Sequence, residues 1–294
     1  MKRILLIPKI RVQNANALSS PYTIGFPAMT AWLGAAHALE RKLKSRDFED
    51  LQFKGMAVIC HQIDLQTYKG QGDYVHSIIG TGNPLDKTGK RPSFIEEARC
   101  HLTVSLVIEY QGVDMDETED FLSTLSTLLH TGSKMAGGDI LAFEPLSVTK
   151  IADEQDLKKL TRKLMPGHCL IERRDLMKAA MQEGQDAIDA LLDHLKIIHR
   201  CEKDDNDQVI WSSHRKEPGW IVPIATGFHG ITDLGQAQSQ RDPDTPHRFA
   251  ESVVTLGEFI MPYRITDLDD MLWHYHTDLE NNLYLCQQTT THSH

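Results

Sequence analysis

Residues 7–46 concentrate the side chains that bind anions and hydrogen-bond to polar ligands. Amides and hydroxyls crowd residues 13–20, and basic residues lie on both sides of them. Cations neutralise phosphate, while amides and hydroxyls bond to phosphates, sugar hydroxyls and base edges, which is how single-stranded RNA is recognised. The side chains that can supply this chemistry are Lys9, Arg11, Gln13, Asn14, Asn16, Ser19, Ser20, His37, Arg41 and Lys44.

The charge of this region contrasts with that of the whole chain. The formal net charge is −10, yet residues 1–46 hold eight lysine and arginine residues against a single acid, Glu40. An acidic protein can bind nucleic acid if its basic residues are grouped and its acidic surface faces elsewhere, for instance a protein partner. Each charged cluster can equally be a solvated surface. Further basic residues, Arg162 among them, occur around 158–174.

Several of these residues have a structural alternative. Asn and Ser at 14–20 also form turns and cap helices. Gly137 and Gly138 let a backbone approach a polynucleotide closely, but they also suit a plain tight turn.

His37 shares a helix face with Arg41 and Lys44, at spacings of four and three residues. In a metal-independent RNA nuclease such a histidine acts as general base on a 2′-hydroxyl. It can also simply bind phosphate, and the sequence shows no second acid–base partner for it.

The histidines and cysteines do not predict a metal site. His274, His276 and the Cys60–His61 pair lack the spacing of a zinc site. The sequence also has no phosphate-binding loop and no hydrolase or dinucleotide motif. We therefore expect no cofactor.

Alternating and helical patterns predict the elements that position these residues. Residues 3–13 alternate as a strand, with Ile4, Leu6, Ile10 and Val12 on one face and Arg3, Lys9, Arg11 and Gln13 on the other. A turn-rich segment at 14–27 precedes a helix from Pro27. Strands follow at 53–66 and 100–110, then a helix that begins with acids and ends at Gly132, and a strand near 140–149. This βαββαβ order predicts an α+β protein with a ferredoxin-like core, the fold of RNA-recognition motifs and of many unrelated proteins.

The chain is long enough for two domains. We expect the core to occupy residues 1–150, with a thumb-like insertion at about 67–98, and an α/β lobe to occupy 151–294. In that lobe the patterns predict helices at 153–164, 174–183, 186–199, 246–260 and 266–276, and strands at 208–224. The five cysteines are scattered and odd in number, and no apolar run reaches the length of a membrane span, so we expect a cytoplasmic protein with reduced thiols.

The chain resembles the small backbone subunit of the type I-F CRISPR surveillance complex (the Csy complex), within the repeat-associated RNA-binding superfamily. The resemblance rests on segments that follow one another along nearly the whole chain. They are VQNANALSSPYTIGFPAMTAWLGAAHALER (12–41), VICH (58–61), NPL (83–85), EEARCHLTVSL (96–106), MAGGDIL (135–141), LTRKLMPG (160–167), KEPGWIVPI (216–224), RDPDTPHRFAES (241–252) and DMLWHYH (270–276).

This resemblance implies a non-catalytic RNA-binding subunit. Its expected partners are the 5′ handle of the CRISPR RNA, the large subunit of the complex, the terminal copy of the repeated backbone subunit and, through the assembled complex, target DNA. Gly137, Gly138, Arg162 and Arg248 join the expected RNA-binding residues. The alternative is a CRISPR-RNA-processing endoribonuclease that uses His37, as in related systems where the equivalent subunit cuts. A third possibility is a small-molecule enzyme on the same core. It would need a closed pocket with convergent polar groups, and no motif in the sequence indicates one.

Overall fold

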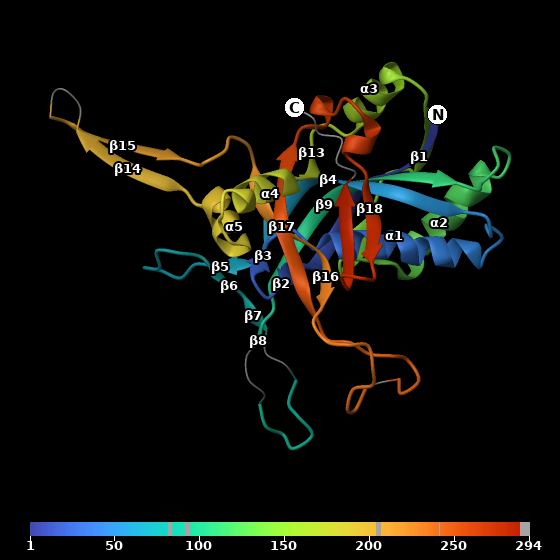
Figure 1. The fold of residues 1–294 in the computed structure, drawn as a ribbon. Coiled ribbons are helices and arrows are strands. Elements are labelled where there is room, and N and C mark those ends of the chain that lie inside the picture. The colour runs from blue at the N-terminus through green and yellow to red at the C-terminus, as the bar shows by residue number, and fades with distance from the viewer. Residues whose placement is uncertain (82–83, 92–94, 204–206, 241, 289–294) are drawn as a thin grey trace.

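The protein belongs to the α+β class and is built around a large antiparallel sheet (Figure 1). The structure is a computed structural model that describes residues 1–81, 84–91, 95–203, 207–240 and 242–288. The first half of the chain forms β1 (Lys2–Asn16), β2 (Leu18–Ser20), β3 (Thr23–Ile24), α1 (Met29–Lys44), β4 (Gln52–Leu65), β5 (Thr67–Tyr68), β6 (Ser77–Ile78), β7 (Gly80–Thr81), β8 (Ile95–Glu96), β9 (Arg99–Gln111), α2 (Thr118–Gly132), β10 (Lys134–Met135), β11 (Gly138–Ala142) and β12 (Ser147–Ile151).

The strands of this half lie side by side in the order β11, β1, β9, β4. The predicted strands at 3–13, 53–66 and 100–110 and both predicted helices are therefore present. The strand expected near 140–149 is instead two strands, because β11 pairs with residues 11–13 of β1 while β12 pairs with residues 2–6. The two separate at Glu144, whose amide donates to the Pro8 carbonyl oxygen at 3.0 Å.

Helices α1 and α2 cover one face of these strands. Helix α1 begins two residues after Pro27 and buries a stripe that includes Trp32 and Leu43, both with no exposed surface. Helix α2 carries Glu119 and Asp120 in its first turn, where the helix dipole favours acids. The two helices pack on Leu5, Ile7 and the inward residues of β4 and β9 to form the main hydrophobic core.

The second half of the chain extends the same sheet. Its elements are α3 (Glu154–Lys163), β13 (His168–Glu172), α4 (Arg174–Gln182), α5 (Ala187–Leu195), β14 (Ile198–Lys203), β15 (Val209–His214), β16 (Ile221–Gly230), β17 (Ala250–Ile260), the 3-10 helices η1 (Pro262–Arg264) and η2 (Leu268–Asp270), β18 (Trp273–Asp278) and β19 (Leu283–Gln288). The three helices predicted between 153 and 199 are present, although α5 ends at Leu195 and β14 begins three residues later.

The two helices predicted at 246–260 and 266–276 are wrong. Residues 250–260 form β17, which pairs with β16 along its length, and 273–278 form β18. Val253, Val254 and Thr255 are β-branched and favour a strand. Their apolar spacing resembled a helix because the buried end of β17 has apolar residues on both faces.

Strand β4 joins the two halves of the chain. It pairs with β9 on one edge, and on its other edge with β13 and, at Met56, with Trp273 of β18. The C-terminal strands lie side by side in the order β13, β17, β16, β19, β18, and both the first and the last of them pair with β4. The boundary expected near residue 150 stays a prediction, and the sheet itself runs across it.

Only part of the second sheet face is covered. Helix α3 and the two 3-10 helices pack on Ile4, Leu6 and Ile59 in a second core, close to the N-terminal end of β1. Beyond that cover the same face of β1, β4 and β9 is polar. This uncovered area of the sheet is open to a ligand.

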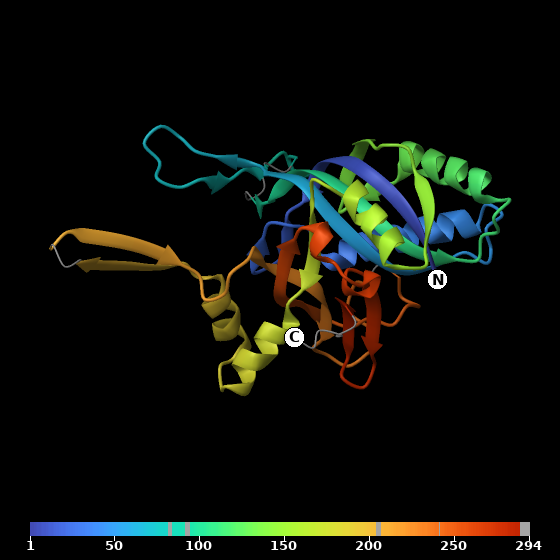
Figure 2. The same cartoon turned by 90° about the horizontal axis from the view of Figure 1, so that it is seen from above.

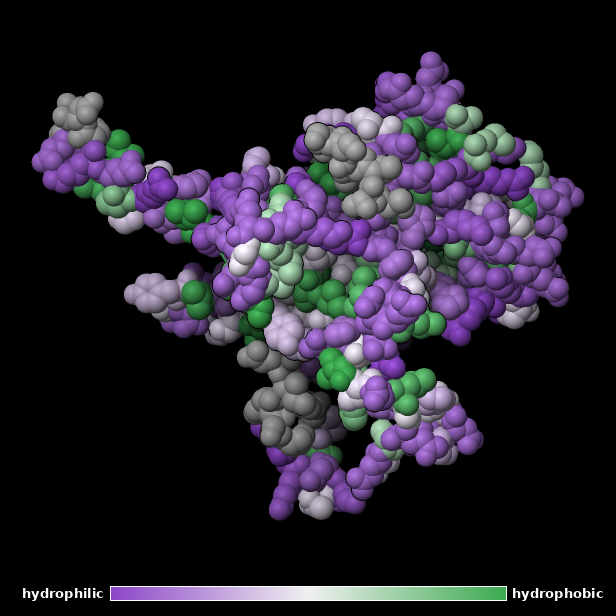
Figure 3. Space-filling view, viewed as in Figure 1, coloured by the Kyte–Doolittle hydropathy of each residue, from purple (hydrophilic) through white to green (hydrophobic). Residues whose placement is uncertain are grey.

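Two arms extend from the body toward the same side (Figures 1 and 2). One is the β14–β15 hairpin, and the other is the segment that links β5 to β6, within the insertion expected at 67–98; residues 82–83 and 92–94 of that insertion lie outside the described residues. Hydrophobic residues lie among hydrophilic ones along the hairpin (Figure 3), where the Trp211 side chain is 70% exposed. The β14–β15 arm was not predicted from the sequence.

All five cysteines are free thiols, and all except Cys201 are buried. Among the helices in the described ranges, none is long and apolar enough to cross a membrane.

The approach of β11 to β1 predicts a specific effect at Gly138. A Cβ atom there would lie 2.6 Å from the Gln13 carbonyl oxygen and 2.7 Å from the Ala15 nitrogen, both backbone atoms. We expect Gly138→Ala to lower the free energy of unfolding by about 1–3 kcal/mol through overpacking. Gly34→Ala is the matched control, since nothing lies within 4 Å of its Cβ position. Chemical denaturation measures both, and an unchanged stability of Gly138→Ala would contradict the close approach.

Candidate nucleic-acid interface

A β-bulge in β1 decides which side chains of that strand face the open part of the sheet. Leu5 and Ile7 lie in the main core, and so do Ile10 and Val12, so the alternation reverses between residues 7 and 10. Lys9 sits in the bulge with φ of 51°. The uniform alternation expected for residues 3–13 is therefore wrong. Without the bulge Arg11 would point into the core; with it, Arg11 and Gln13 face the open side.

Strand β4 has a second bulge beside the first. Its register with β9 shifts between Cys60 and Gln62, at His61. Val58 and Cys60 belong to the main core, and Ile63 packs against it. The shift turns Gln62 and Asp64 away from the core and onto the same open face as Arg11.

The buried hydroxyl of Ser105 on β9 ties the two bulges together. Its Oγ accepts the Lys9 backbone N–H at 3.0 Å and lies 2.7 Å from His61 Nε2. His61 Nδ1 lies 2.5 Å from the Pro166 carbonyl oxygen, which accepts, and 2.8 Å from the Lys9 ammonium, which donates. A single hydroxyl thus holds both strand irregularities in register.

The pKa values of the two basic groups at this junction are both lowered. Burial lowers the pKa of His61, and the Lys9 ammonium 2.8 Å from Nδ1 lowers it further, although the bond to Pro166 opposes both. Burial also lowers the pKa of Lys9, offset in part by Glu144. Because Ser105 is only 2% exposed, its hydrogen bond to His61 is structural and not a nucleophile–base pair.

Beyond this junction lies a polar groove of about 280 Å³. Strand β1 contributes Arg11 and Gln13, and β9 contributes His101 and Thr103. Its complete lining is Arg11, Val12, Gln13, Gln62, Asp64, His101, Leu102, Thr103 and Leu141. The groove offers one cation, one carboxylate, two side-chain amides, an imidazole and a hydroxyl, which suits base edges and sugars better than a run of phosphates.

Asn14 borders this groove through a network of amides. Its backbone N–H donates to His101 Nδ1 at 3.3 Å, and its Oδ1 accepts from Gln66 Nε2 at 2.6 Å. Asn14 has φ of 56°, a conformation that Asn tolerates better than most residues. The structure therefore brings together Arg11, Gln13 and Asn14, with Lys9 at the adjoining bulge.

Three other predicted residues use their polar groups within the turn. The Asn16 side-chain amide donates to the Leu18 carbonyl oxygen and accepts from the Leu18 backbone N–H, both at 3.1 Å. The hydroxyls of Ser19 and Ser20 lie 2.9 and 2.7 Å from Thr23 Oγ1. These contacts match the turn-forming alternative for the three residues.

Gly137 and Gly138 form the hairpin between β10 and β11. Gly137 has φ of 77°, and Gly138 allows β11 to lie against β1. The turn is thus explained by packing, and Gly137 remains exposed beside β1.

The helical group of predicted residues lies elsewhere. His37, Arg41 and Lys44 belong to α1, which packs on the sheet face opposite to the groove. Lys44 Nζ pairs with Glu40 at 2.8 Å. The basic residues of β1 and α1 are therefore two surfaces separated by the sheet.

Arg162 and Arg248 join neither surface. Arg162 is exposed in the last turn of α3. Arg248 packs against Gly230 and donates to the Asn282 side chain, beyond β16.

The groove residues from β4 and β9 were not among the predicted site residues. They are Gln62, Asp64, Gln66, His101 and Thr103. His101 and Thr103 alternate with the buried Leu102 and Val104 along β9, and this alternation was the available signal. On β4 the bulge at His61 interrupts the alternation, so the sequence did not show that Gln62 and Asp64 face the open side.

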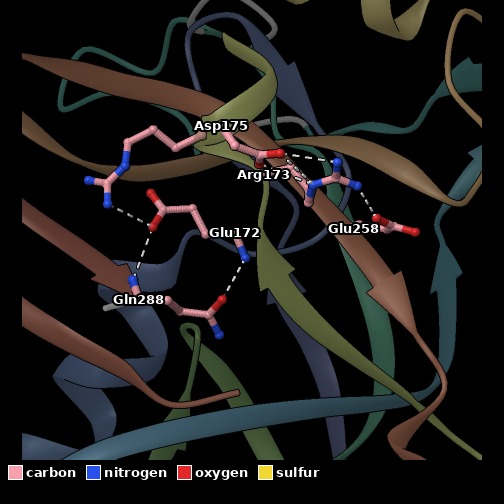
Figure 4. A network of polar contacts seen from close by, with 6 residues as sticks. Glu172, Arg173, Asp175, Glu258 and Gln288 are labelled. Carbon is pink, nitrogen blue, oxygen red and sulfur yellow. Dashed lines mark hydrogen bonds and ion pairs between the residues drawn. The ribbon is translucent and has the colours of Figure 1, made fainter. Parts of the chain in front are cut away.

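A second charged cluster, between β13, β17 and β19, is structural (Figure 4). The backbone N–H of Glu172 donates to Gln288 Oε1 at 2.8 Å, and the backbone N–H of Gln288 donates to Glu172 Oε2 at 3.0 Å. Burial raises the pKa of Glu172, and Arg174 opposes that shift. Arg173 bridges Asp175 and Glu258. The charged groups of this cluster pair with one another, and the cluster therefore stabilises the contact between these strands.

Within the residues that the structure describes, no three His, Cys, Asp or Glu side chains are grouped as a metal site. Burial raises the pKa of the Cys60 thiol to about 11, so Cys60 is a poor metal ligand at neutral pH.

The half-buried His61 predicts a pH dependence of stability. Its pKa is lower in the folded than in the unfolded protein, so its contribution is complete above about pH 6.5 and is lost as the pH falls toward the folded-state value. We expect His61→Gln to flatten the decline in unfolding free energy between pH 7 and pH 5, relative to the unmodified protein. The exposed His276→Gln is the control and should keep the original slope. Urea denaturation at each pH measures this, and equal slopes in all three proteins would contradict it.

The sequence comparisons agree with a CRISPR assignment. A family model, CRISPR-associated protein (Cas_Csy2), matches residues 5–286. The CRISPR-associated protein Csy2 of Pseudomonas aeruginosa (strain UCBPP-PA14) is 32% identical over 309 residues, covering 96% of this chain and 94% of that protein. The expected type I-F Csy assignment is confirmed, but the description as the small backbone subunit is wrong, because Csy2 is not that subunit. The chain therefore belongs to the Csy2 family of the type I-F CRISPR complex.

Proposed function

We propose that this protein is a non-catalytic RNA-binding subunit of a type I-F Csy complex, and that it holds the 5′ handle of the CRISPR RNA. Its core is then a ferredoxin-like RNA-binding unit. The large subunit shares the handle, the terminal copy of the repeated backbone subunit abuts this protein, and the assembled complex meets target DNA through guide pairing.

The groove on the open sheet face is the observation that carries this proposal. It gathers Arg11, Gln13 and Asn14 with amide, imidazole and carboxylate groups from β4 and β9. Single-stranded RNA exposes the base edges that such groups recognise. Arg11 neutralises a phosphate, while Gln13 and Gln62 bond to base edges or ribose hydroxyls.

The net charge of −10 fits a subunit that works within an assembly. Alone, an acidic protein whose groove offers one cation binds RNA weakly and without strong dependence on salt. Basic partner subunits supply the remaining phosphate contacts and the complementary surface for its acids.

Two substitutions separate the expected roles of groove residues. We expect Arg11→Ala to weaken binding of a handle RNA and to reduce the slope of log K against log salt by about 0.7, the loss of one single-strand phosphate contact. Gln13→Ala should weaken binding without changing the slope, because an amide releases no counterion. Fluorescence anisotropy with labelled handle RNA at several salt concentrations measures both.

Lys178→Ala provides the control, as an exposed cation on α4 away from the groove. Binding and salt slope that stay the same in Arg11→Ala and Gln13→Ala would contradict the groove as the RNA site.

The endoribonuclease alternative is tested at His37. Its neighbour Glu40 already accepts the Phe53 N–H at 2.7 Å and pairs with Lys44, so it is not free to serve as a proton-transfer partner. We expect no cleavage when repeat RNA is incubated with the purified protein in EDTA. A product that appears with the unmodified protein and is absent with His37→Ala, resolved on a denaturing gel, would overturn the non-catalytic assignment.

A further inference from the structure

The structure contains an aromatic pocket where the two halves of the chain meet. It has a volume of about 330 Å³ and lies between α1, β4, β18 and β19, on the sheet face opposite to the groove. Leu33, Ala36, Met56 and Trp273 form its apolar floor, and each is at most 5% exposed. Pockets between structural units, with an apolar floor and a few polar groups, are the usual form of a ligand site.

Two tyrosines from the C-terminal strands form the wall of this pocket. Tyr275 pairs with Cys286, and Tyr284 pairs with Thr277, so the tyrosines are diagonal neighbours on one sheet face. Their rings lie 5.4 Å apart. Each tyrosine still has 39% of its surface exposed, so ring surface is available to a ligand.

The rim of the pocket is positively charged. His37 lies on it, with its ring 6.4 Å from that of Tyr275. Arg41 is exposed one turn beyond His37 on the same face of α1, and Lys54 is exposed on β4. The one acid, Glu40, is neutralised by Lys44 and accepts the Phe53 N–H. In a chain of net charge −10, this combination selects a ligand that is flat, apolar on its faces and anionic.

We propose that this pocket binds one nucleotide, with the base against Tyr275 and Tyr284 and the phosphate near Arg41 and Lys54. Bases stack on aromatic side chains, and the cations neutralise the phosphate. The inference rests on the proposed function in taking RNA as the source of that nucleotide. Because the pocket and the groove lie on opposite sheet faces, this nucleotide is not one of those held in the groove.

The test uses the full chain and labelled handle RNA, with AMP and UMP as separate probes. We expect Tyr275→Ala and Tyr284→Ala each to weaken RNA binding by roughly 5- to 150-fold, the usual cost of a lost stacking partner. Tyr275→Phe and Tyr284→Phe keep the ring and should bind nearly normally. Tyr263→Ala, at a tyrosine 65% exposed outside the pocket, is the matched control and should bind as the unmodified protein does.

Photocrosslinking of the unmodified protein with 5-bromouridine-substituted RNA gives a second readout that needs no variant. We expect crosslinked peptides to contain His37, Tyr275 or Tyr284. Competition by AMP or UMP identifies a free nucleotide as a sufficient ligand, whereas binding by RNA alone assigns the site to the handle; both support a nucleotide pocket.

Failure of this inference is distinguishable from failure of the proposed function. Normal RNA affinity in both alanine variants, with crosslinks only at the groove, overturns the pocket and leaves the groove intact. Normal affinity in the groove and pocket variants alike overturns both. Loss of a co-purifying protein subunit from Tyr275→Ala, with RNA binding unchanged, makes the pocket a protein-docking site and also overturns the inference.

Discussion

The open polar face of the sheet depends on the hydrogen bonds made by the Ser105 hydroxyl. This group accepts the Lys9 N–H from the bulge of β1 and is hydrogen-bonded to His61 Nε2 in the bulge of β4. Both bulges reverse the alternation of their strands at the same level of the sheet. If either strand continued its regular pleat, its polar residues would turn into the hydrophobic core, at a cost of several kcal/mol for each unpaired charge or amide.

The surrounding structure explains why the bulges occur at this position. Helix α3 and the 3-10 helices cover the sheet up to the level of Ile59, and β11 and β12 separate beside Pro8. The loop after α3 then places the Pro166 carbonyl against His61, where Gly167 has no side chain to interfere. The apolar part of this sheet face, which α3 covers, therefore ends at the hydrogen bonds of Ser105 and His61, and the polar groove begins there. On the other face, the shared strand β4 brings the C-terminal tyrosines to α1.

Local patterns in the sequence predicted much of the first half of the fold, because α1 and α2 each bury one apolar stripe and the strands between them are rich in apolar residues. They located β1, α1, β4, β9 and α2, and they selected Arg11, Gln13 and Asn14. They did not reveal the bulges, because a bulge depends on the strand opposite. The segments 246–260 and 266–276 were read as helices because their long-range pairing with β16 and β19 is not visible locally. Tyr275 and Tyr284 were missed as neighbours of His37 for the same reason.

Hydrogen–deuterium exchange of the Ser105→Ala protein tests the central role of that hydroxyl most directly. The substitution leaves the Lys9 N–H and His61 Nε2 without their shared partner, a loss of about 1–3 kcal/mol for each unsatisfied group. The account predicts faster exchange of backbone amides in both bulged segments, 7–13 and 59–64, while α2 exchanges as before. Unchanged exchange in both segments would show that the bulges form without Ser105 and would contradict the account.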